Sequence, residues 1–260
     1  NAYDDGVWLR DPYLHRVTHN GKTKFHLVHT WGWDHPALFH WESDDLIHWT
    51  AANSGTRTDD GKIMLMDGHD GGPVSPNAWA PEFTYDEQTG TFYLYWSSRI
   101  GDRQVHHYCT TKDWLTFSTP AVYFDPGFTA IDMTILKEGG TYYAYYKDER
   151  NGEKTIRCAT SKSLDPCVQR FEGSTPLLPS RYIEVEGPEV FPVIGGKGWF
   201  LYFDKFNGDR GVSYTGCTDP SQHKWYPISD DEIRNPTEVK HGSVEIISTT
   251  ELEKLLEHFK

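Results

Sequence analysis

The chain has 260 residues, of which 15% are aromatic, and a formal net charge of −13 at pH 7. This charge repels phosphate groups, so it argues against nucleic acid or an anionic membrane as a partner and favours a neutral or cationic ligand. No run of about 18 apolar residues occurs, so we expect no membrane span. The four cysteines lack the spacing of a zinc site or a disulfide scaffold, although Cys158 and Cys167 could close one short loop.

One unit of three strands recurs four times along the chain. It opens with a strand that begins polar and becomes apolar, at residues 11–17, 81–86, 132–137 and 188–193. A glycine-containing turn follows, and then an aromatic strand, at 25–30, 92–97, 142–147 and 199–204. A third strand runs into a polar turn, at 37–49, 105–117, 155–165 and 211–225. The first interval is longer because a Gly- and Asp-rich loop occupies residues 54–75.

Short strands in repeated units of about 50 residues predict an all-β fold, the β-propeller. A β-sandwich also has many short strands, but it does not repeat the same order of polar-first and aromatic strands four times. A fifth start occurs at 241–247, followed by a helix-like stretch at 250–259. We therefore expect a five-bladed propeller as a single domain over residues 1–260. Its fifth blade would be incomplete, or completed by sequence upstream of Asn1.

Three acidic residues fall at or beside the equivalent first positions of the repeats. Aligning the repeats places five residues together, namely Asp11, Ala80, Asp132, Gly187 and His241, with Glu186 one residue earlier. Inner strands of a propeller meet around a central channel, so we expect the three carboxylates at one mouth. Each has an ordinary explanation alone, such as a turn at Asp11 before Pro12. Like charges at close range are unfavourable, so their recurrence predicts a functional site.

Glycosidic cleavage uses carboxyl groups in this way. One protonated carboxyl group gives its proton to the leaving oxygen, and an ionised one activates water on the opposite face of the sugar. A third carboxylate can raise the pKa of the acid and orient it. Sugars also stack on aromatic rings, and candidates for this contact lie on loops beside the strand starts, namely Trp31, Trp33, Trp79 and Phe128.

Five short motifs, in their order and spacing, resemble glycoside hydrolase family 43. They are RDP at 10–12, NAWAPE at 77–82, AID at 130–132, EGPEV at 186–190 and HGS at 241–243. Members of that family are five-bladed propeller enzymes that act on arabinose- and xylose-containing plant polysaccharides. The resemblance extends from about residue 8 to residue 247. Each motif is short, and it is the ordered series that is specific.

The resemblance implies roles for the three carboxylates. Asp11 looks like the general base, Asp132 like the residue that tunes and positions the acid, and Glu186 like the general acid. Such an enzyme inverts the configuration at the anomeric carbon, and its acid and base lie about 6.5–9.5 Å apart.

The resemblance also implies roles for residues around the site. Trp79 resembles the substrate platform, and Arg150 could replace an arginine that the fifth blade often supplies. His241 resembles a channel histidine that lies near a calcium or sodium ion in some members. A hydrogen-bonded structural histidine is an equally good interpretation. No cofactor is required for the reaction.

The sequence departs from the family pattern at two places, and two other functions are alternatives to the one that the resemblance implies. Met133 stands where the family commonly has proline, and the fifth blade is short. A retaining fructosidase of the family 32 type would carry NDPNG and ECP motifs, whereas this chain has RDPYL and EGP. A carbohydrate-binding propeller without catalysis is the alternative from another class, and the presence of all three acids favours the enzyme.

The substrate is predicted from the rim of the expected site. The aromatic stretch 31–35 and the loop 54–75 suggest a closed pocket for a terminal sugar, which favours an exo-acting α-L-arabinofuranosidase over an endo-arabinanase or a β-xylosidase. The expected partner is an arabinose- or xylose-containing oligo- or polysaccharide. Because such polymers are extracellular, we expect a secreted or periplasmic protein, with the cytoplasm as the alternative for an enzyme that trims oligosaccharides.

Overall fold

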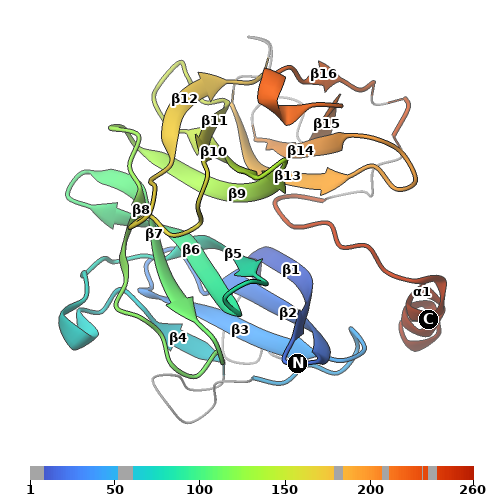
Figure 1. Cartoon of the computed structure of the whole chain (residues 1–260), viewed down its shortest axis with the longest axis horizontal. Coiled ribbons are helices and arrows are strands. Elements are labelled where there is room, and N and C mark those ends of the chain that lie inside the picture. The colour runs from blue at the N-terminus through green and yellow to red at the C-terminus, as the bar shows by residue number, and fades with distance from the viewer. Residues whose placement is uncertain (1–8, 52–60, 179–183, 207–210, 230, 234–238) are drawn as a thin grey trace. The chain divides into compact units, whose positions relative to one another are not determined.

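The computed structural model describes residues 9–51, 61–178, 184–206, 211–229, 231–233 and 239–260. Four sheets of four strands make up most of it, and in each sheet consecutive strands are neighbours (Figure 1). The first sheet consists of β1 (Arg10–His19), β2 (Lys22–Thr30), β3 (Ala37–Ser43) and β4 (Lys62–Met64). The second consists of β5 (Trp79–Asp86), β6 (Thr91–Ile100), β7 (Arg103–Thr111) and β8 (Ala121–Phe124).

The other two sheets repeat this plan. The third consists of β9 (Ala130–Glu138), β10 (Thr141–Asp148), β11 (Ile156–Ser161) and β12 (Glu172–Pro176). The fourth consists of β13 (Val185–Pro192), β14 (Trp199–Lys205), β15 (Gly211–Cys217) and β16 (Tyr226–Pro227). The described residues also form two 3₁₀ helices, η1 (His69–Gly71) and η2 (Pro220–Gln222), and one α-helix, α1 (Thr249–His258). All four predicted repeats are confirmed as sheets.

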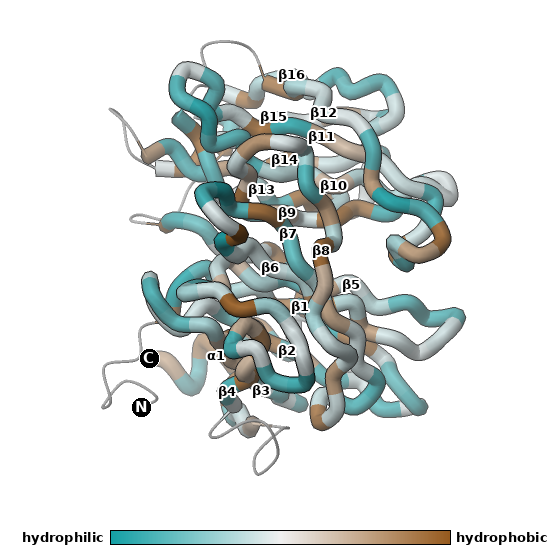
Figure 2. The backbone as a smooth tube through the Cα atoms, turned by 90° about the vertical axis from the view of Figure 1, so that its left-hand side faces the viewer, coloured by the Kyte–Doolittle hydropathy of each residue, from teal (hydrophilic) through white to brown (hydrophobic). Residues whose placement is uncertain are grey.

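The aromatic strand of each repeat is the second strand of its sheet. In β6 and β10 seven consecutive residues are buried, so these strands have no solvent-facing side. Burial on both faces explains why they read as continuous apolar and aromatic runs instead of alternating with polar residues. The turns between strands are polar and glycine-rich, and they are coloured mainly as hydrophilic in Figure 2.

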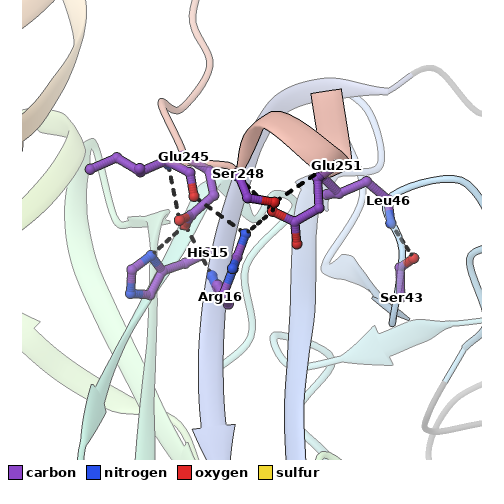
Figure 3. Close-up of polar contacts among 8 residues, drawn as sticks. His15, Arg16, Ser43, Leu46, Glu245, Ser248 and Glu251 are labelled. Atoms are coloured by element: carbon purple, nitrogen blue, oxygen red, sulfur yellow. Dashed lines mark hydrogen bonds and ion pairs between the residues drawn. The ribbon is translucent and has the colours of Figure 1, made fainter. Parts of the chain in front are cut away.

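The prediction that residues 241–247 begin a fifth blade was wrong. These residues form no strand, and the described part of the chain contains four sheets. Instead, side chains of this segment bond the backbone of β1, the edge strand of the first sheet. The Leu14 amide donates to Ser243 Oγ at 2.7 Å. The Arg16 amide donates to Glu245 Oε2 at 3.0 Å (Figure 3). Side-chain oxygens thus satisfy edge amides that a neighbouring strand would otherwise have paired.

The helix predicted at 250–259 is confirmed as α1. Ser248 and Glu251 form a reciprocal capping box at its first turn, which satisfies amides that have no partner within the helix. Arg16 of β1 donates to Glu251 Oε2 at 2.8 Å, so the carboxylate that caps the helix also binds the first sheet (Figure 3).

The chain divides into two compact units. The first comprises residues 1–94, 109–120 and 243–260, and the second comprises residues 95–108 and 121–242. Part of the rim loop predicted at 54–75 lies outside the described residues, at 54–60. All four cysteines lie within the described residues as thiols, and Cys109, Cys158 and Cys217 are buried. In the described part of the chain no helix is both long and apolar enough to cross a membrane.

Each unit has its own aromatic core. In the first unit the Trp114 ring lies 5.4 Å from Phe83 and 5.1 Å from Phe92, measured between centroids. In the second unit a cluster forms around Tyr145, whose ring meets Trp225 edge-on at 5.6 Å. Such offset and edge-on contacts add to the stability that burial of the rings provides.

Two buried histidines of β7 predict that acid destabilises the second unit. Burial lowers the pKa of His106 to about 3 and that of His107 to about 4. In the unfolded chain both histidines have a pKa of about 6.5, so the unfolded state takes up protons first as the pH falls. The free energy of unfolding therefore decreases between about pH 6.5 and pH 4. One such histidine contributes about 2 kcal/mol to the difference between pH 7 and pH 5.

Urea unfolding at pH 7 and pH 5 measures this effect. His107→Gln should reduce the loss of stability between the two pH values, whereas His69→Gln, a change of an exposed histidine, should leave it unchanged. Equal losses in wild type and His107→Gln would contradict the prediction.

Candidate functional site

The four equivalent strand starts share an unusual backbone conformation. Asp11, Ala80, Asp132 and Gly187 have φ values of 47°, 45°, 54° and 56°. The pairing register shifts at this place in β1, opposite Asp132 in β10 and in β13, as at a β-bulge. The alignment of repeats made from the sequence is therefore confirmed by the backbone. Three of the four residues are not glycine, and strain retained at such residues is typical of functional sites.

In the first unit, Asp11 accepts a hydrogen bond from the hydroxyl group of Thr30. The Ala80 amide donates to Thr30 Oγ1 at 2.8 Å, and Thr30 Oγ1 donates to Asp11 Oδ2 at 2.9 Å. Because the hydroxyl oxygen of Thr30 already accepts from Ala80, its proton is free to point at Asp11. A donor aimed at a carboxyl oxygen favours the ionised form of that carboxyl group.

In the second unit, Asp132 is buried and also accepts a backbone donor. Its Oδ2 accepts from the Gly187 amide at 3.1 Å, and its own amide donates to Ser97 Oγ at 3.2 Å. The first bond joins β9 to the start of β13, one residue after Glu186. The structure therefore places Asp132 and Glu186 near each other in the second unit. Asp11 belongs to the first unit.

Glu186 is held by a residue that the sequence reasoning missed. Lys147 Nζ, on a side chain that is only 3% exposed, donates to Glu186 Oε2 at 2.6 Å. Burial opposes the charge on Lys147, but the carboxylates of Asp132 and Glu186 outweigh it and raise the pKa of Lys147. A lysine in the otherwise apolar and aromatic run of β10 was the signal that could have identified it.

The neighbouring charges leave the pair of carboxylates undercompensated. Glu149 contacts Lys147 at 2.6 Å but also pairs with Lys154 at 3.3 Å. Asp132, Glu186 and Glu149 therefore all interact with the ammonium group of Lys147. Three carboxylates and two ammonium groups together carry a net negative charge.

Asp204, a second missed residue, lies opposite Glu186 in the pairing of β13 with β14. Burial raises the pKa of Asp204, while nearby Lys240 lowers it and Glu186 raises it. The backbone of His241 bonds Asp204, which brings the motif at 241–243 to the same end of β13. The role predicted for His241 near an ion stays a prediction.

Gly187 cannot carry a side chain without moving His241. A Cβ atom on Gly187 would lie 2.7 Å from Cγ of His241, and Gly187 has a φ of +56°. We expect Gly187→Ala to lower both stability and kcat/KM. The left-handed backbone alone costs roughly 1–2 kcal/mol, and the His241 ring must also shift.

Gly139→Ala is the matched control for this substitution. Its φ is +55°, and a Cβ atom there would meet nothing within 4 Å. Urea unfolding should show a similar backbone cost in both variants, but only Gly187→Ala should lose activity. Equal activity in both would contradict the assignment of the His241 contact to the site.

The predicted aromatic residues of the first unit form two groups. Trp33 is 61% exposed, meets Trp79 edge-on at 5.7 Å, and accepts a hydrogen bond on its carbonyl from Trp79 Nε1 at 2.8 Å. The guanidinium carbon of Arg10 lies 3.7 Å from the centre of the Trp33 ring. Trp31 instead stacks on His35 at 4.0 Å. Trp33 and Trp79 are thus in contact, and Trp33 has most of its surface free for a ligand.

Phe128 and Arg150, both in the second unit, lie together. The guanidinium carbon of Arg150 is 3.9 Å from the centre of the Phe128 ring. Arg150 Nη2 also donates to Asp148 Oδ2 at 2.7 Å, and 44% of the Arg150 side chain is exposed. Arg150 is therefore oriented by a buried carboxylate and an aromatic ring, with donors left for a ligand.

Comparisons with known proteins identify the family of the chain. A family model described as a probable glycosyl hydrolase domain, related to glycoside hydrolase family 43, matches residues 4–253. The chain is similar to an α-L-arabinofuranosidase of Bifidobacterium longum subsp. longum. The two are 27% identical over 252 residues, which cover 78% of this chain and 22% of that protein. The chain thus spans about a fifth of the length of that relative.

Solved structures show the same fold. A thermostable family 43 glycoside hydrolase has a TM-score of 0.62 and 21% identity, over 88% of this chain and 73% of that one. An α-L-arabinanase of Cellvibrio cellulosa in complex with arabinohexaose has a TM-score of 0.54 and 14% identity, over 82% and 73%.

The four repeated sheets define an all-β propeller with the fold of solved glycoside hydrolases, and two of the sheets carry an aspartate in a strained backbone conformation near their start. Since the family model covers nearly the whole chain, the assignment can be made more specific. The chain belongs to the glycosyl hydrolase domains related to glycoside hydrolase family 43.

Proposed function

We propose that the domain is an inverting, exo-acting α-L-arabinofuranosidase that removes terminal arabinose from arabinose- or xylose-containing carbohydrates. The observation that carries this proposal is the pair of carboxylates, Asp132 and Glu186, that share Lys147. Similarity to the arabinofuranosidase of Bifidobacterium longum supports the choice of sugar. Because such polymers are extracellular, we also propose a secreted or periplasmic location.

Hydrogen bonding supports ionised forms of two of the three carboxyl groups. Asp11 and Asp132 each accept a bond from a fixed neutral donor, Thr30 Oγ1 and the Gly187 amide respectively, and these bonds favour their ionised forms. Glu186 is bound to Lys147, which Asp132 also attracts. The resemblance of EGPEV at 186–190 to the family motif supports Glu186 as the general acid. We assign the base to Asp11 and the tuning of the acid to Asp132.

In the proposed reaction, the proton on Glu186 moves to the glycosidic oxygen as the bond from that oxygen to the anomeric carbon breaks. Asp11 takes a proton from a water molecule whose oxygen attacks the anomeric carbon from the opposite face. The leaving alcohol departs neutral, and the sugar is released with inverted configuration. Lys147 keeps Glu186 in place and then stabilises the carboxylate that remains after proton transfer.

The remaining contacts would serve substrate binding. The exposed ring of Trp33, held against Trp79, offers an apolar face on which a sugar can stack. Arg150 offers guanidinium donors to sugar hydroxyl groups. We also propose that His241 helps to hold a calcium or sodium ion, which the reaction itself does not require.

Proton NMR of hydrolysis tests the proposal. Aryl glycosides of α-L-arabinofuranose, β-D-xylose, β-D-galactose and β-D-fructofuranose are supplied, and the first anomer released is recorded before it mutarotates. We expect turnover of the arabinofuranoside with the β-anomer appearing first. Retention would overturn the inverting mechanism, and preference for another sugar would overturn the substrate. Binding without turnover of any of them would indicate a carbohydrate-binding propeller.

A further inference from the structure

Two histidines and a glutamate that the hydrolytic reaction does not use converge on one face of the first sheet. His26 of β2 lies directly opposite Glu42 of β3 in the pairing register, and His40 lies two residues before Glu42. Side chains two residues apart on a strand point to the same face, and directly opposed residues are close neighbours. The two strands therefore present three metal-ligating side chains to a single point.

The donor atoms are spaced as ligands of one ion. His26 Nδ1 lies 3.0 Å from His40 Nε2 and 3.8 Å from Glu42 Oε1, and all three donor atoms lie within 4.8 Å of one another. Tetrahedral zinc with bonds of about 2.0–2.1 Å requires ligand atoms about 3.4 Å apart. The observed distances of 3.0 Å and 3.8 Å lie on either side of that value, so small side-chain rotations would bring the three donor atoms to the spacing that zinc requires.

We propose that His26, His40 and Glu42 form a binding site for a divalent transition metal such as Zn²⁺, with a water molecule as the fourth ligand. Two imidazoles and one carboxylate are a donor set that suits zinc better than calcium or magnesium, which prefer oxygen ligands alone. None of these residues belongs to the set assigned to hydrolysis. The ion would cross-link β2 and β3.

The protonation of the ligands suits a cation. Burial lowers the pKa of His26 to about 3 and that of His40 well below its usual range, so both rings are neutral near pH 7 and each has a lone pair to offer. One shared proton now lies between the two facing nitrogen atoms. On metal binding this proton moves to the far nitrogen of its own ring, and both facing lone pairs then point at the ion.

The surroundings orient the three ligands. Lys24 Nζ donates to Glu42 Oε2 at 2.5 Å, which leaves Oε1 facing His26. The ring of Trp114 stacks on His40 at 3.7 Å with an interplanar angle of 6°, and Phe92 lies 5.3 Å from His26. Hydrogen bonding of a ligating carboxylate and an apolar wall around the imidazoles are features that tune protein metal sites.

One feature limits the affinity of this site. His40 Nδ1 is buried and makes no hydrogen bond, although a metal-ligating histidine usually donates its other N–H to an acceptor. The Lys24 ammonium also repels a second cation near Glu42. We therefore expect binding weaker than that of a structural zinc site with four protein ligands.

Titration of tag-free, chelator-treated protein with Co²⁺ and then Zn²⁺ tests the proposal. We expect one equivalent of Co²⁺ to give the intense visible bands of tetrahedral coordination, and Zn²⁺ to abolish them. Excess Zn²⁺ should also raise the unfolding temperature, because it binds only the folded state. Absence of a saturable one-to-one signal in calorimetry and absorption would overturn the proposal.

Variants separate this site from adventitious binding. Glu42→Gln preserves an acceptor for Lys24, so it should fold normally while losing at least tenfold in metal affinity. His40→Gln should lose the tetrahedral bands. His48→Gln removes an exposed histidine that pairs with Asp45 at 2.8 Å, and it should bind as wild type does. Equal affinities of Glu42→Gln and His48→Gln would overturn the proposal even if His40→Gln failed to fold.

Discussion

Glu186→Gln is expected to lower kcat/KM for an arabino-oligosaccharide by about 10²–10⁴-fold, the range that a positioned general acid supplies. Glutamine keeps the shape of the side chain and an acceptor for Lys147 Nζ, now 2.6 Å from Glu186 Oε2. It cannot donate a proton to the glycosidic oxygen. The leaving sugar would then depart as an alkoxide, which is a far poorer leaving group than an alcohol.

The dependence on the leaving group distinguishes a lost acid from a damaged fold. An aryl arabinoside with an acidic phenol needs little protonation, so Glu186→Gln should retain much more activity on it than on the oligosaccharide. The alkaline limb of the pH profile of kcat/KM, where the general acid of the wild type loses its proton, should also change. Glu172→Gln makes the same chemical change at an exposed residue of β12 and should behave as wild type. Equal losses on both substrates would contradict the role of acid.

Much of the fold follows from periodicity in the sequence. The aromatic runs of β6 and β10 are buried on both faces, so they read as short continuous apolar segments bounded by turn residues. The equivalence of Asp11, Asp132 and Gly187 was also predictable, because each precedes an apolar strand at the same point of a repeat. Their shared left-handed backbone was not, since sequence spacing gives no φ angles.

The features that were missed depend on tertiary contacts. Lys147 lies within an aromatic strand, and only the pairing of strands shows that its ammonium reaches Glu186. The segment at 241–247 reads like the start of a blade, but Ser243 and Glu245 bond the edge of β1 through side chains, which no strand pattern predicts. His26 and His40 converge only because β2 and β3 pair in one register.

Asp11→Asn is expected to lower kcat/KM by a similar factor of about 10²–10⁴, but to the same extent for every leaving group. Removal of the base impairs attack by water, and a better leaving group does not replace it. Asparagine is the appropriate substitution because Asp11 has a φ of 47°, a conformation that asparagine adopts more readily than alanine. The acceptor for Thr30 Oγ1, now 2.9 Å from Asp11 Oδ2, is also retained.

Measuring Asp11→Asn beside Glu186→Gln therefore distinguishes the base from the acid better than either variant alone. Both should unfold in urea near the wild-type midpoint, and Asp44→Asn, an exposed change of the same kind, should keep full activity. If Asp11 is the base, the ratio of aryl to oligosaccharide activity rises in Glu186→Gln and stays constant in Asp11→Asn. A rise in both variants, or full activity in Asp11→Asn, would mean that another group activates water. The carboxylate at the start of β1 would then be a strained turn residue with no part in the chemistry.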